Sequence, residues 1–192
     1  MRIGIFGGTF DPVHRGHLEL AQNARAQFSL DKVVFVPAYQ PPHKQNTPSL
    51  TPAQDRYEMV RLSLEGEAGL EISDCEVSRK GVSYTVDTIL EFEKKYPGAE
   101  LFLILGKDTL TGLSGWHRAD ELKKMVRFLV ARRETDETPE VPGARVDWIR
   151  MPLCPVSASG IRQAIKQGKQ VDDDLPLKVQ QYIREHKLYR EN

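Results

Sequence analysis

The chain has 192 residues, long enough to bury a substantial core. Its 27 Lys and Arg balance its 27 Asp and Glu, so the formal net charge is zero, which argues against a protein that grips nucleic acid nonspecifically through a basic face. No apolar run approaches the length of a membrane span, the N-terminus lacks a signal-peptide core, and Cys75 and Cys154 lack metal-like or CxxC spacing, so we expect reduced thiols in a cytoplasmic protein.

Apolar runs alternate with amphipathic segments along the whole chain. Runs such as VVFVP and LFLILG are almost continuously apolar, as parallel strands covered on both faces are. The alternation predicts an α/β fold in one domain over residues 1–192: a doubly wound parallel sheet with helices on both faces and a short C-terminal helical segment. The expected strands are 2–6, 32–37, 71–73, 100–105, 127–131 and 146–149, and the expected helices are 17–28, 52–64, 85–96, 118–124, 157–166 and 175–186.

The first turn, GGTFDPVHRGH, carries the features of a phosphate site. Gly7 and Gly8 are expected to break the first strand and to let the backbone approach a ligand closely. His14 and His17 lie three residues apart at the start of a helical pattern, so they face the same way and can donate hydrogen bonds to phosphate oxygens. In the competing interpretation the glycines serve only a tight turn and each histidine is an ordinary surface residue.

Two connections, 38–51 and 132–144, are longer than usual for a compact domain, which is typical of functional or mobile loops. Within the first, PPHK predicts a stiff extended segment that presents His43 and Lys44. Because ligands bind outside the carboxyl ends of the strands in such a sheet, this loop and the first turn should share one edge. A simply solvated Lys44 is the alternative.

Two later segments carry residues that could bind a carboxylate, a ribose or an aromatic ring. Ser83, Tyr84 and Thr85 lie at the start of a helix, where free N–H groups can bind a carboxylate. Farther along, Asp108 could accept hydrogen bonds from ribose hydroxyls, and Trp116 could stack on a cationic pyridinium ring. The alternatives are a helix cap for Asp108 and a core position for Trp116.

Near the C-terminus, VSASGIR predicts a capped helix that suits a polyphosphate. Ser157 is a good N-cap, and Arg162 follows five residues later on the same helix, so aligned N–H groups, a hydroxyl and a guanidinium come together. A plain capped helix with a solvated arginine is the alternative.

Taken in order, GGTFDPVHRGH, PPHK, SYT, GKD with a following Trp, and SxSxIR resemble the motifs of bacterial nicotinate-nucleotide adenylyltransferases, in the HxGH nucleotidyltransferase superfamily. The closing VQQYIREHKLY resembles the C-terminal helix of that family, so the resemblance covers essentially the whole chain. The chain departs from the family pattern at Ser159, where Thr is more frequent, and at His117, where a Tyr often follows the Trp.

The resemblance implies a Rossmann-like nucleotidyltransferase that joins ATP and nicotinate mononucleotide, with Mg²⁺ and no protein-bound metal, in NAD biosynthesis. The products are deamido-NAD and pyrophosphate. The acceptor phosphate has a second pKa of about 6 and is largely a dianion at neutral pH, so no general base is needed. On this basis His14, His17 and Arg162 are assigned to catalysis, and ATP binding to Gly7, Gly8, Thr9, Phe10, His14, His17, Ser157, Ser159 and Arg162. Acceptor binding is assigned to Lys44, Ser83, Tyr84, Thr85, Gly106, Asp108, Trp116 and His117.

Several alternatives stay open at this point. Within the superfamily the acceptor could be nicotinamide mononucleotide or phosphopantetheine, although the latter has no pyridine ring for Trp116. The chain could also be a nucleotide sensor without turnover, against which the intact His14 and His17 argue, or a nucleic-acid-binding module, against which the zero net charge argues. The expected partners are the two small-molecule substrates, with no nucleic acid and no membrane, in a monomer or a homo-oligomer.

Overall fold

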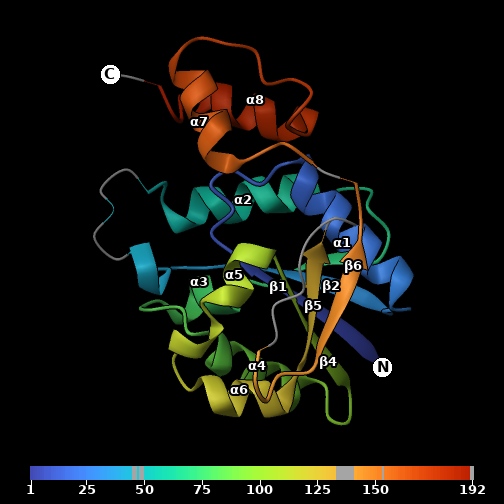
Figure 1. The fold of residues 1–192 in the computed structure, drawn as a ribbon. Helices are drawn as coiled ribbons and strands as arrows, with labels where there is room; N and C mark the ends of the chain where they lie inside the picture. Colours follow the sequence, from blue (N-terminus) through green and yellow to red (C-terminus); the bar gives the residue numbers. More distant parts are fainter. Residues whose placement is uncertain (45–46, 48–49, 133–140, 153, 191–192) are drawn as a thin grey trace.

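A single parallel sheet organises the molecule. The computed structural model describes residues 1–44, 47, 50–132, 141–152 and 154–190, except for the side chains of Lys107 and Asp108. The sheet has six parallel strands in the order β3-β2-β1-β4-β5-β6 (Figure 1). Their bounds are Arg2–Gly8 (β1), Lys32–Pro37 (β2), Leu70–Ile72 (β3), Glu100–Leu105 (β4), Arg127–Arg132 (β5) and Val146–Arg150 (β6).

Helices cover both faces of the sheet. On one face lie α1 and α2, with the C-terminal helices stacked beyond α2, and on the other lie α4 and α6 (Figure 1). Among the described residues, no helix has the length and apolarity to span a bilayer. The helices are Arg15–Gln27 (α1), Ala53–Ser63 (α2), Cys75–Arg79 (α3), Thr85–Lys95 (α4), Lys107–Thr111 (α5), Ala119–Met125 (α6), Ala158–Lys166 (α7) and Leu177–Glu185 (α8), with 3-10 turns at Pro42–Lys44 (η1) and Leu113–Gly115 (η2).

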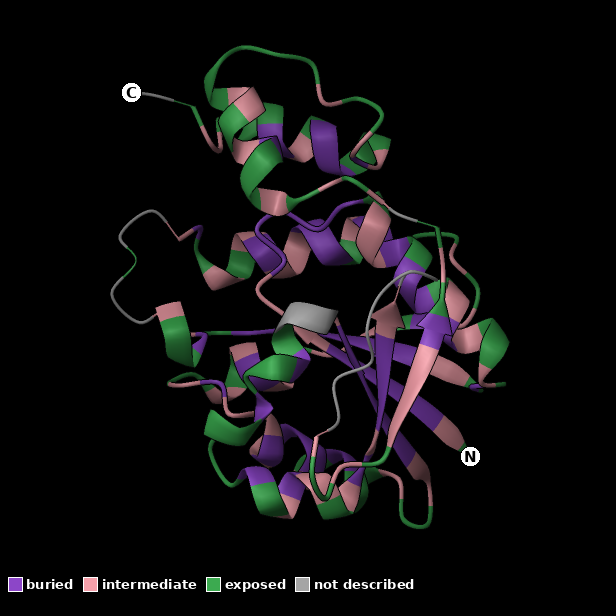
Figure 2. Ribbon diagram, in the orientation of Figure 1, coloured by how far each residue is buried: buried purple, intermediate pink, exposed green. Residues whose placement is uncertain are grey.

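Side-chain alternation along the strands divides the core between the two faces. Phe6 and Phe35 point into the cluster under α1, α2, α7 and α8, while Ile5 and Val34 point into the cluster under α4 and α6. Both faces of the central strands are therefore buried (Figure 2). The prediction of a doubly wound α/β fold with a C-terminal helical segment is confirmed.

The predicted bounds of β2 and β4 agree with the structure, but the prediction for the end of β1 was wrong. Gly7 and Gly8 do not break β1: they continue the ladder opposite Val36 and Pro37 of β2. Glycine can adopt the extended conformation, and β2 supplies partners as far as its own last residue, so the strand ends only after Gly8.

The prediction for PPHK was also wrong. Pro42–Lys44 forms the 3-10 turn η1 rather than an extended segment, and the Lys44 N–H donates to the Pro41 carbonyl at 2.9 Å. A local i to i+3 bond of this kind leaves no periodic signal in a sequence. The turn η2 was not predicted for the same reason, and the helices α3 and α5 were not predicted because five residues are too few for a helical period to stand out.

The topology brings three connections to one edge. The strand order reverses between β1 and β4, and in such sheets this point is where ligands bind. The segments that follow β1, β2 and β4 therefore meet around the end of β1. Residues 45–46 and 48–49 of the first long connection, and 133–140 of the second, lie outside the described residues.

Candidate active site

The end of β1, the turn after it and the start of α1, residues 7–17, pack around Phe10, and we call this segment the β1–α1 turn. The Phe10 side chain is 2% exposed, and its ring lies 5.5 Å from Phe35 and 5.1 Å from His17, measured between ring centroids. A Cβ at Gly8 would stand 2.8 Å from this ring, whereas a Cβ at Gly7 would meet no described atom within 4 Å. Gly8 thus makes room for a core aromatic ring, and only Gly7 leaves open space for a ligand. Of Phe10, only the backbone is free to face a nucleotide.

His14 and His17 face the same way at the start of α1, as predicted, and their rings are in contact at an interplanar angle of 32°. Their ring centroids are 3.7 Å apart, and the His14 backbone N–H donates to Nδ1 of His17 at 3.2 Å. A neutral imidazole has one donor and one acceptor nitrogen, so Nε2 of His17 carries the proton. Nδ1 of His14 is buried and has no hydrogen-bond partner among the described residues. The pair therefore presents one fixed donor and one unsatisfied nitrogen.

Burial lowers the pKa of both histidines. Desolvation lowers the pKa of His14 to about 4. The pKa of His17 lies well below its ordinary value, because of burial and then because of the neighbouring His14. Both rings are neutral at pH 7 without ligand, and a polyanion beside them would favour their charged forms.

Helix α7 contributes an arginine to the same turn. Arg162 donates from Nη1 to the Asp11 carbonyl at 2.7 Å, a contact between residues 151 positions apart. Ser157 caps α7 by accepting the Gly160 N–H at 3.1 Å, and its Oγ lies 3.4 Å from Oγ of Ser159. The two exposed hydroxyls and the first N–H groups of α7 therefore lie on the element that anchors Arg162 to the turn.

Lys44 adds a second cation. Its Nζ donates to Oγ1 of Thr9 at 3.3 Å. Desolvation lowers the pKa of Lys44, and the positive charge of the nearby Arg162 lowers it further. The two cations are therefore close enough to act on the same anion. A site with neutral histidines, a lysine and an arginine around an open glycine suits a phosphate chain.

The sequence analysis missed a buried network behind this turn. Arg56 is 0% exposed and donates to the carbonyls of Thr51, Thr9 and Tyr39. The Asp11 carboxylate accepts from the Tyr189 hydroxyl at 2.7 Å. Arg56 follows the spacing of the buried Met59 and Val60 on α2, and a charged residue on an apolar stripe is the signal that could have found it.

The predicted acceptor residues fall on three segments, 39–44, 83–85 and 106–117, which we call the acceptor segments. The Ser83 hydroxyl is buried and accepts the Tyr39 N–H at 2.9 Å, while the Ser83 N–H donates to the Gln40 carbonyl at 2.9 Å. The side chain of Ser83 therefore joins two acceptor segments instead of facing the solvent. Thr85 begins α4, so its N–H has no intrahelical acceptor and is available to a ligand.

The third acceptor segment touches the second through aromatic rings. The centroids of Tyr84 and His117 are 4.3 Å apart. Trp116 is half-buried and packs against the core cluster under α4 and α6, in agreement with the core alternative, and its stacking on a pyridinium ring stays a prediction. Gly106 caps α5 directly after β4. The side chain of Asp108, the predicted ribose acceptor, lies outside the described residues.

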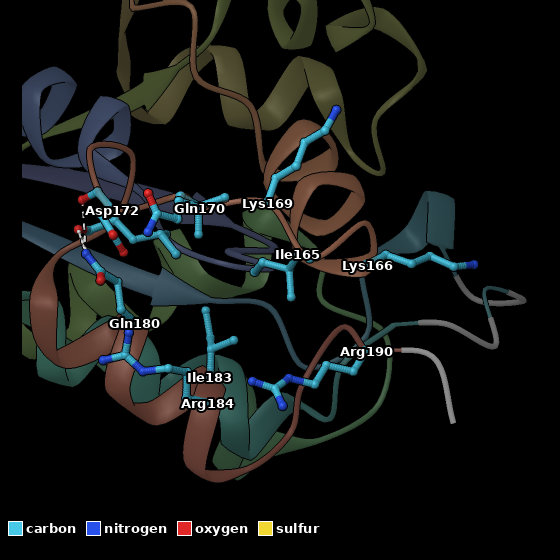
Figure 3. Close-up of a pocket in the computed structure, with 12 residues that line it drawn as sticks. Ile165, Lys166, Lys169, Gln170, Asp172, Gln180, Ile183, Arg184 and Arg190 are labelled. Carbon is cyan, nitrogen blue, oxygen red and sulfur yellow. Dashed lines mark hydrogen bonds between the residues drawn. The ribbon is translucent and has the colours of Figure 1, made fainter.

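A cavity of about 530 Å³ lies elsewhere, between α7 and α8 (Figure 3). Its floor is apolar, with Ile165 and Ile183, and its rim carries Lys169, Arg184 and Arg190. In Figure 3 the Lys169 side chain points away from Ile165 and Ile183. None of the predicted site residues lines this cavity, so it is separate from the β1–α1 turn.

The donor set around the turn offers little to a bare metal ion. Among the described residues, no group of three or more His, Cys, Asp and Glu side chains is placed to hold one. Mg²⁺ keeps several waters and is usually bound through substrate phosphates and one or two carboxylates. These residues thus fit an ion that arrives with a phosphate chain.

The relatives found by comparison with known proteins carry the same name. A family model described as Cytidylyltransferase-like matches residues 5–164. A protein of Exiguobacterium sibiricum, named "Probable nicotinate-nucleotide adenylyltransferase", is 41% identical over 189 residues, which cover 98% of this chain and 99% of that protein. A protein of Shouchella clausii with the same name is 40% identical over 191 residues, covering 100% of this chain and 98% of its own length.

Solved structures share the fold. The Plasmodium falciparum nicotinic acid mononucleotide adenylyltransferase complexed with NaAD has a TM-score of 0.82 and 19% identity, covering 98% of this chain and 97% of its own. The same enzyme complexed with APC gives a TM-score of 0.80, also at 19% identity, with coverage of 98% and 96%. At this identity the likeness concerns the arrangement of strands and helices.

Proposed function

Since the chain belongs to the nicotinate-nucleotide adenylyltransferases of the cytidylyltransferase-like family, we propose that it transfers the adenylyl group of ATP to nicotinate mononucleotide. The products are nicotinate adenine dinucleotide (deamido-NAD) and pyrophosphate. The observation that carries the proposal is the β1–α1 turn, where two stacked histidines, an open glycine, Lys44 and the anchored Arg162 converge.

The chemistry is an in-line displacement at the α-phosphorus of ATP. An oxygen of the acceptor 5′-phosphate forms a bond to the α-phosphorus, and the bond from that phosphorus to the bridging oxygen breaks, so pyrophosphate leaves with the electron pair. The acceptor phosphate is largely a dianion at neutral pH and attacks without a general base. The protein supplies position and stabilisation of the charge on the transferring and leaving groups.

On the ATP side, His17 donates from Nε2, whose proton is fixed because Nδ1 already accepts the His14 N–H. Beside it, Nδ1 of His14 is buried and has no hydrogen-bond partner among the described residues. A nearby anion favours the protonated form of this ring. Arg162, with Ser157 and Ser159 at the start of α7, binds the β and γ phosphates, where a guanidinium and free N–H groups are strong donors.

On the acceptor side, Lys44 orients the acceptor phosphate from its position beside Thr9. The N–H groups at the start of α4, near Thr85, bind the nicotinate carboxylate, and Trp116 offers its face to the pyridinium ring. Gly106 and Asp108 follow β4 at the ligand edge of the sheet, which suits contacts to the ribose.

Mg²⁺ enters the site with the ATP phosphates in this proposal. When bound it neutralises charge that develops on the phosphate oxygens. The chain's own contribution is the cationic and N–H donor set around the turn. We place the reaction in the cytoplasm, a location that the free thiols of Cys75 and Cys154 favour.

A panel of acceptors with Mg-ATP tests the reaction, with pyrophosphate release and product mass as readouts. We expect turnover with nicotinate mononucleotide, and a preference over nicotinamide mononucleotide of about tenfold to a thousandfold in kcat/KM. An amide turns an NH₂ toward at least one N–H of the pocket, and an unpaired buried donor costs about 1–3 kcal/mol. No turnover with any pyridine nucleotide would refute the function.

The same panel with Trp116→Ala separates stacking from carboxylate recognition. Stacking does not distinguish a carboxylate from an amide, so the variant should weaken both acceptors and leave most of the preference intact. Equal efficiency of the wild-type protein with both nucleotides would refute the carboxylate pocket while leaving adenylyl transfer in place.

A further inference from the structure

Arg56 is the largest side chain in the fully buried core, and no contact with a substrate explains it. It lies on α2 with 0% of its surface exposed. Its guanidinium donates from Nε to the Thr51 carbonyl at 2.8 Å, from Nη1 to the Thr9 carbonyl at 2.7 Å and from Nη2 to the Tyr39 carbonyl at 2.9 Å. Every nitrogen of the side chain is thus committed to the backbone of another segment.

Two of these carbonyls belong to opposite sides of the proposed site. Thr9 lies in the β1–α1 turn, and its hydroxyl accepts from Lys44. Tyr39 opens the first acceptor segment, and its N–H is held by the Ser83 hydroxyl at 2.9 Å, one residue before Tyr84. A chain of hydrogen bonds therefore runs from the ATP side through Arg56 and Tyr39 to the start of α4.

Core stability alone does not call for a charge at this position. A buried ion needs compensation, and replacement of a buried ion pair by well-packed apolar residues is often neutral or stabilising. The neighbouring buried positions on α2, Met59 and Val60, are apolar. An apolar residue cannot donate hydrogen bonds to the three carbonyls. A lysine cannot reproduce the planar arrangement of guanidinium donors either.

We propose that Arg56 is a positioning residue that fixes the β1–α1 turn relative to the acceptor segments, so that the acceptor phosphate meets the α-phosphorus in line. This inference rests on the proposed adenylyl transfer. Arg56 touches neither substrate, so it acts only through the carbonyls of Thr9 and Tyr39. A reaction between two bound molecules is sensitive to their relative placement, and a misplacement of about 1 Å can cost on the order of a hundredfold in rate.

The test is Arg56→Lys, with Val60→Ala as the matched control. Val60 is also 0% exposed, lies one turn farther along α2, and its side chain has no polar atom to bond the site backbone. Thermal midpoints are measured first, and each variant is assayed at the same margin below its own midpoint. We expect Arg56→Lys to lower kcat about tenfold to a hundredfold, with less than about a threefold change in the Kd of each substrate bound alone. Val60→Ala should keep kcat within about threefold.

Equal kcat losses in the two variants would overturn the proposal, and so would a loss in Arg56→Lys that appears only in KM. If the wild-type protein shows no turnover, the proposed function fails instead, so the two failures are distinguishable.

Backbone hydrogen exchange on the wild-type protein gives a second test that does not depend on a variant that folds. If Arg56 couples the two sides, nicotinate mononucleotide alone should slow exchange of the amides of Gly8, Thr9 and Phe10 at least about threefold. Unchanged exchange at these amides, with slowed exchange at the start of α4 as proof of binding, would overturn the coupling.

Discussion

The β1–α1 turn and the acceptor segments are built differently. In the turn, His14 is 7% exposed and Phe10 2%, and the turn is tied to distant parts of the chain through Arg56 and Arg162. In the acceptor segments, Trp116 is half-buried and His117 is exposed, and the rings of Tyr84 and His117 join the second and third segments. The first region is already closed around its donors, whereas the second leaves side chains open to solvent.

This difference follows the needs of the reaction. Charge develops at the phosphorus centre, and donors that are held in place before the reaction stabilise it without further reorganisation. Recognition of a pyridine ring can instead draw on groups that come together when the ligand binds, at some cost in affinity. We therefore expect changes in the turn to act on rate or stability, and changes in the acceptor segments to act mainly on binding of the acceptor.

The largest effect should come from the histidine pair. His17→Ala removes the donor that the His14 N–H orients, and loss of one such donor typically costs about 3 kcal/mol, on the order of a hundredfold in kcat. His14→Ala should behave similarly. Because the rings are stacked at 3.7 Å, the double variant should lose less than the sum of the two single losses. Steady-state kinetics with saturating ATP and acceptor measure these changes.

His186→Ala is the matched control, since this histidine is exposed at the end of α8 and stacks only on Tyr182. It should retain wild-type kcat. Near-normal turnover in His17→Ala would remove this histidine from the mechanism and erase the contrast between the two regions.

The fold was predictable because the central strands are covered on both faces. Continuous apolar runs define β2 and β4 without competing signals, and their bounds agree with the structure. The predicted end of β1 was wrong because glycine was taken to break the strand. The pairing of Gly8 with Pro37 depends on the neighbouring strand β2, which the local sequence of β1 does not show. The turn η1 depends on one local hydrogen bond, and the proline-rich sequence carries no pattern that predicts this bond.

The site was predictable where it is local and where the sheet topology decides it, since the first long connection was expected beside the first turn and Lys44 does contact Thr9. The contact between His14 and His17 follows from helical spacing. The bonds from Arg56 to Thr9 and from Tyr189 to Asp11 join residues 47 and 178 positions apart, and no periodicity in a single sequence connects them. Burial of Arg56 is the feature that a closer reading of α2 could have found, because Arg56 shares the helical spacing of the buried, uncharged residues Met59, Val60 and Ser63.

The two glycines of the turn offer the next contrast. In Gly8→Ala the new Cβ would stand 2.8 Å from the Phe10 ring, so the ring or the backbone must shift, which typically costs about 1–3 kcal/mol. In Gly7→Ala the Cβ enters open space and should leave the free energy of unfolding within about 0.5 kcal/mol. Urea unfolding of both variants measures this.

If Gly7 faces the nucleotide, Gly7→Ala should instead weaken ATP binding, which calorimetry can follow. Equal destabilisation by the two substitutions would contradict the packing of Phe10 described here.

The pH dependence of stability should also centre on the turn. The pKa of His14 is about 4 in the folded protein against an ordinary value of 6.5, so the unfolded chain binds its proton first as the pH falls. The free energy of unfolding therefore decreases from about pH 6.5 toward pH 4, by about 2 kcal/mol from this residue at pH 5. His14→Gln should remove that share of the loss between pH 7.5 and pH 5. An identical pH slope in wild type and His14→Gln would show that His14 is not buried as a neutral ring.

The smallest effect probes how closely a nucleotide covers the turn. Sγ of Cys154 lies 2.9 Å from the position of a Cβ at Gly16, and Nδ1 of His14 lies 3.2 Å from the same position. A triphosphate bound beside His14 should therefore shield this thiol from an aromatic disulfide reagent. With Cys75→Ser to leave one thiol, ATP at ten times its Kd should slow labelling of Cys154 by up to about tenfold, the limit set by mass action.

The reverse variant, Cys154→Ser, supplies the comparison, because Cys75 packs against the core cluster under α4 and α6 and its thiol pKa is raised by burial. Labelling of Cys75 in this variant should be slow, and addition of ATP should not change its rate. Nicotinate mononucleotide alone should protect Cys154 less than ATP does, since this thiol lies beside Gly16, in the turn assigned to ATP. If the acceptor protects Cys154 as fully as ATP, then Gly16 and Cys154 border both substrates, and the turn cannot be treated as a region that serves the nucleotide alone.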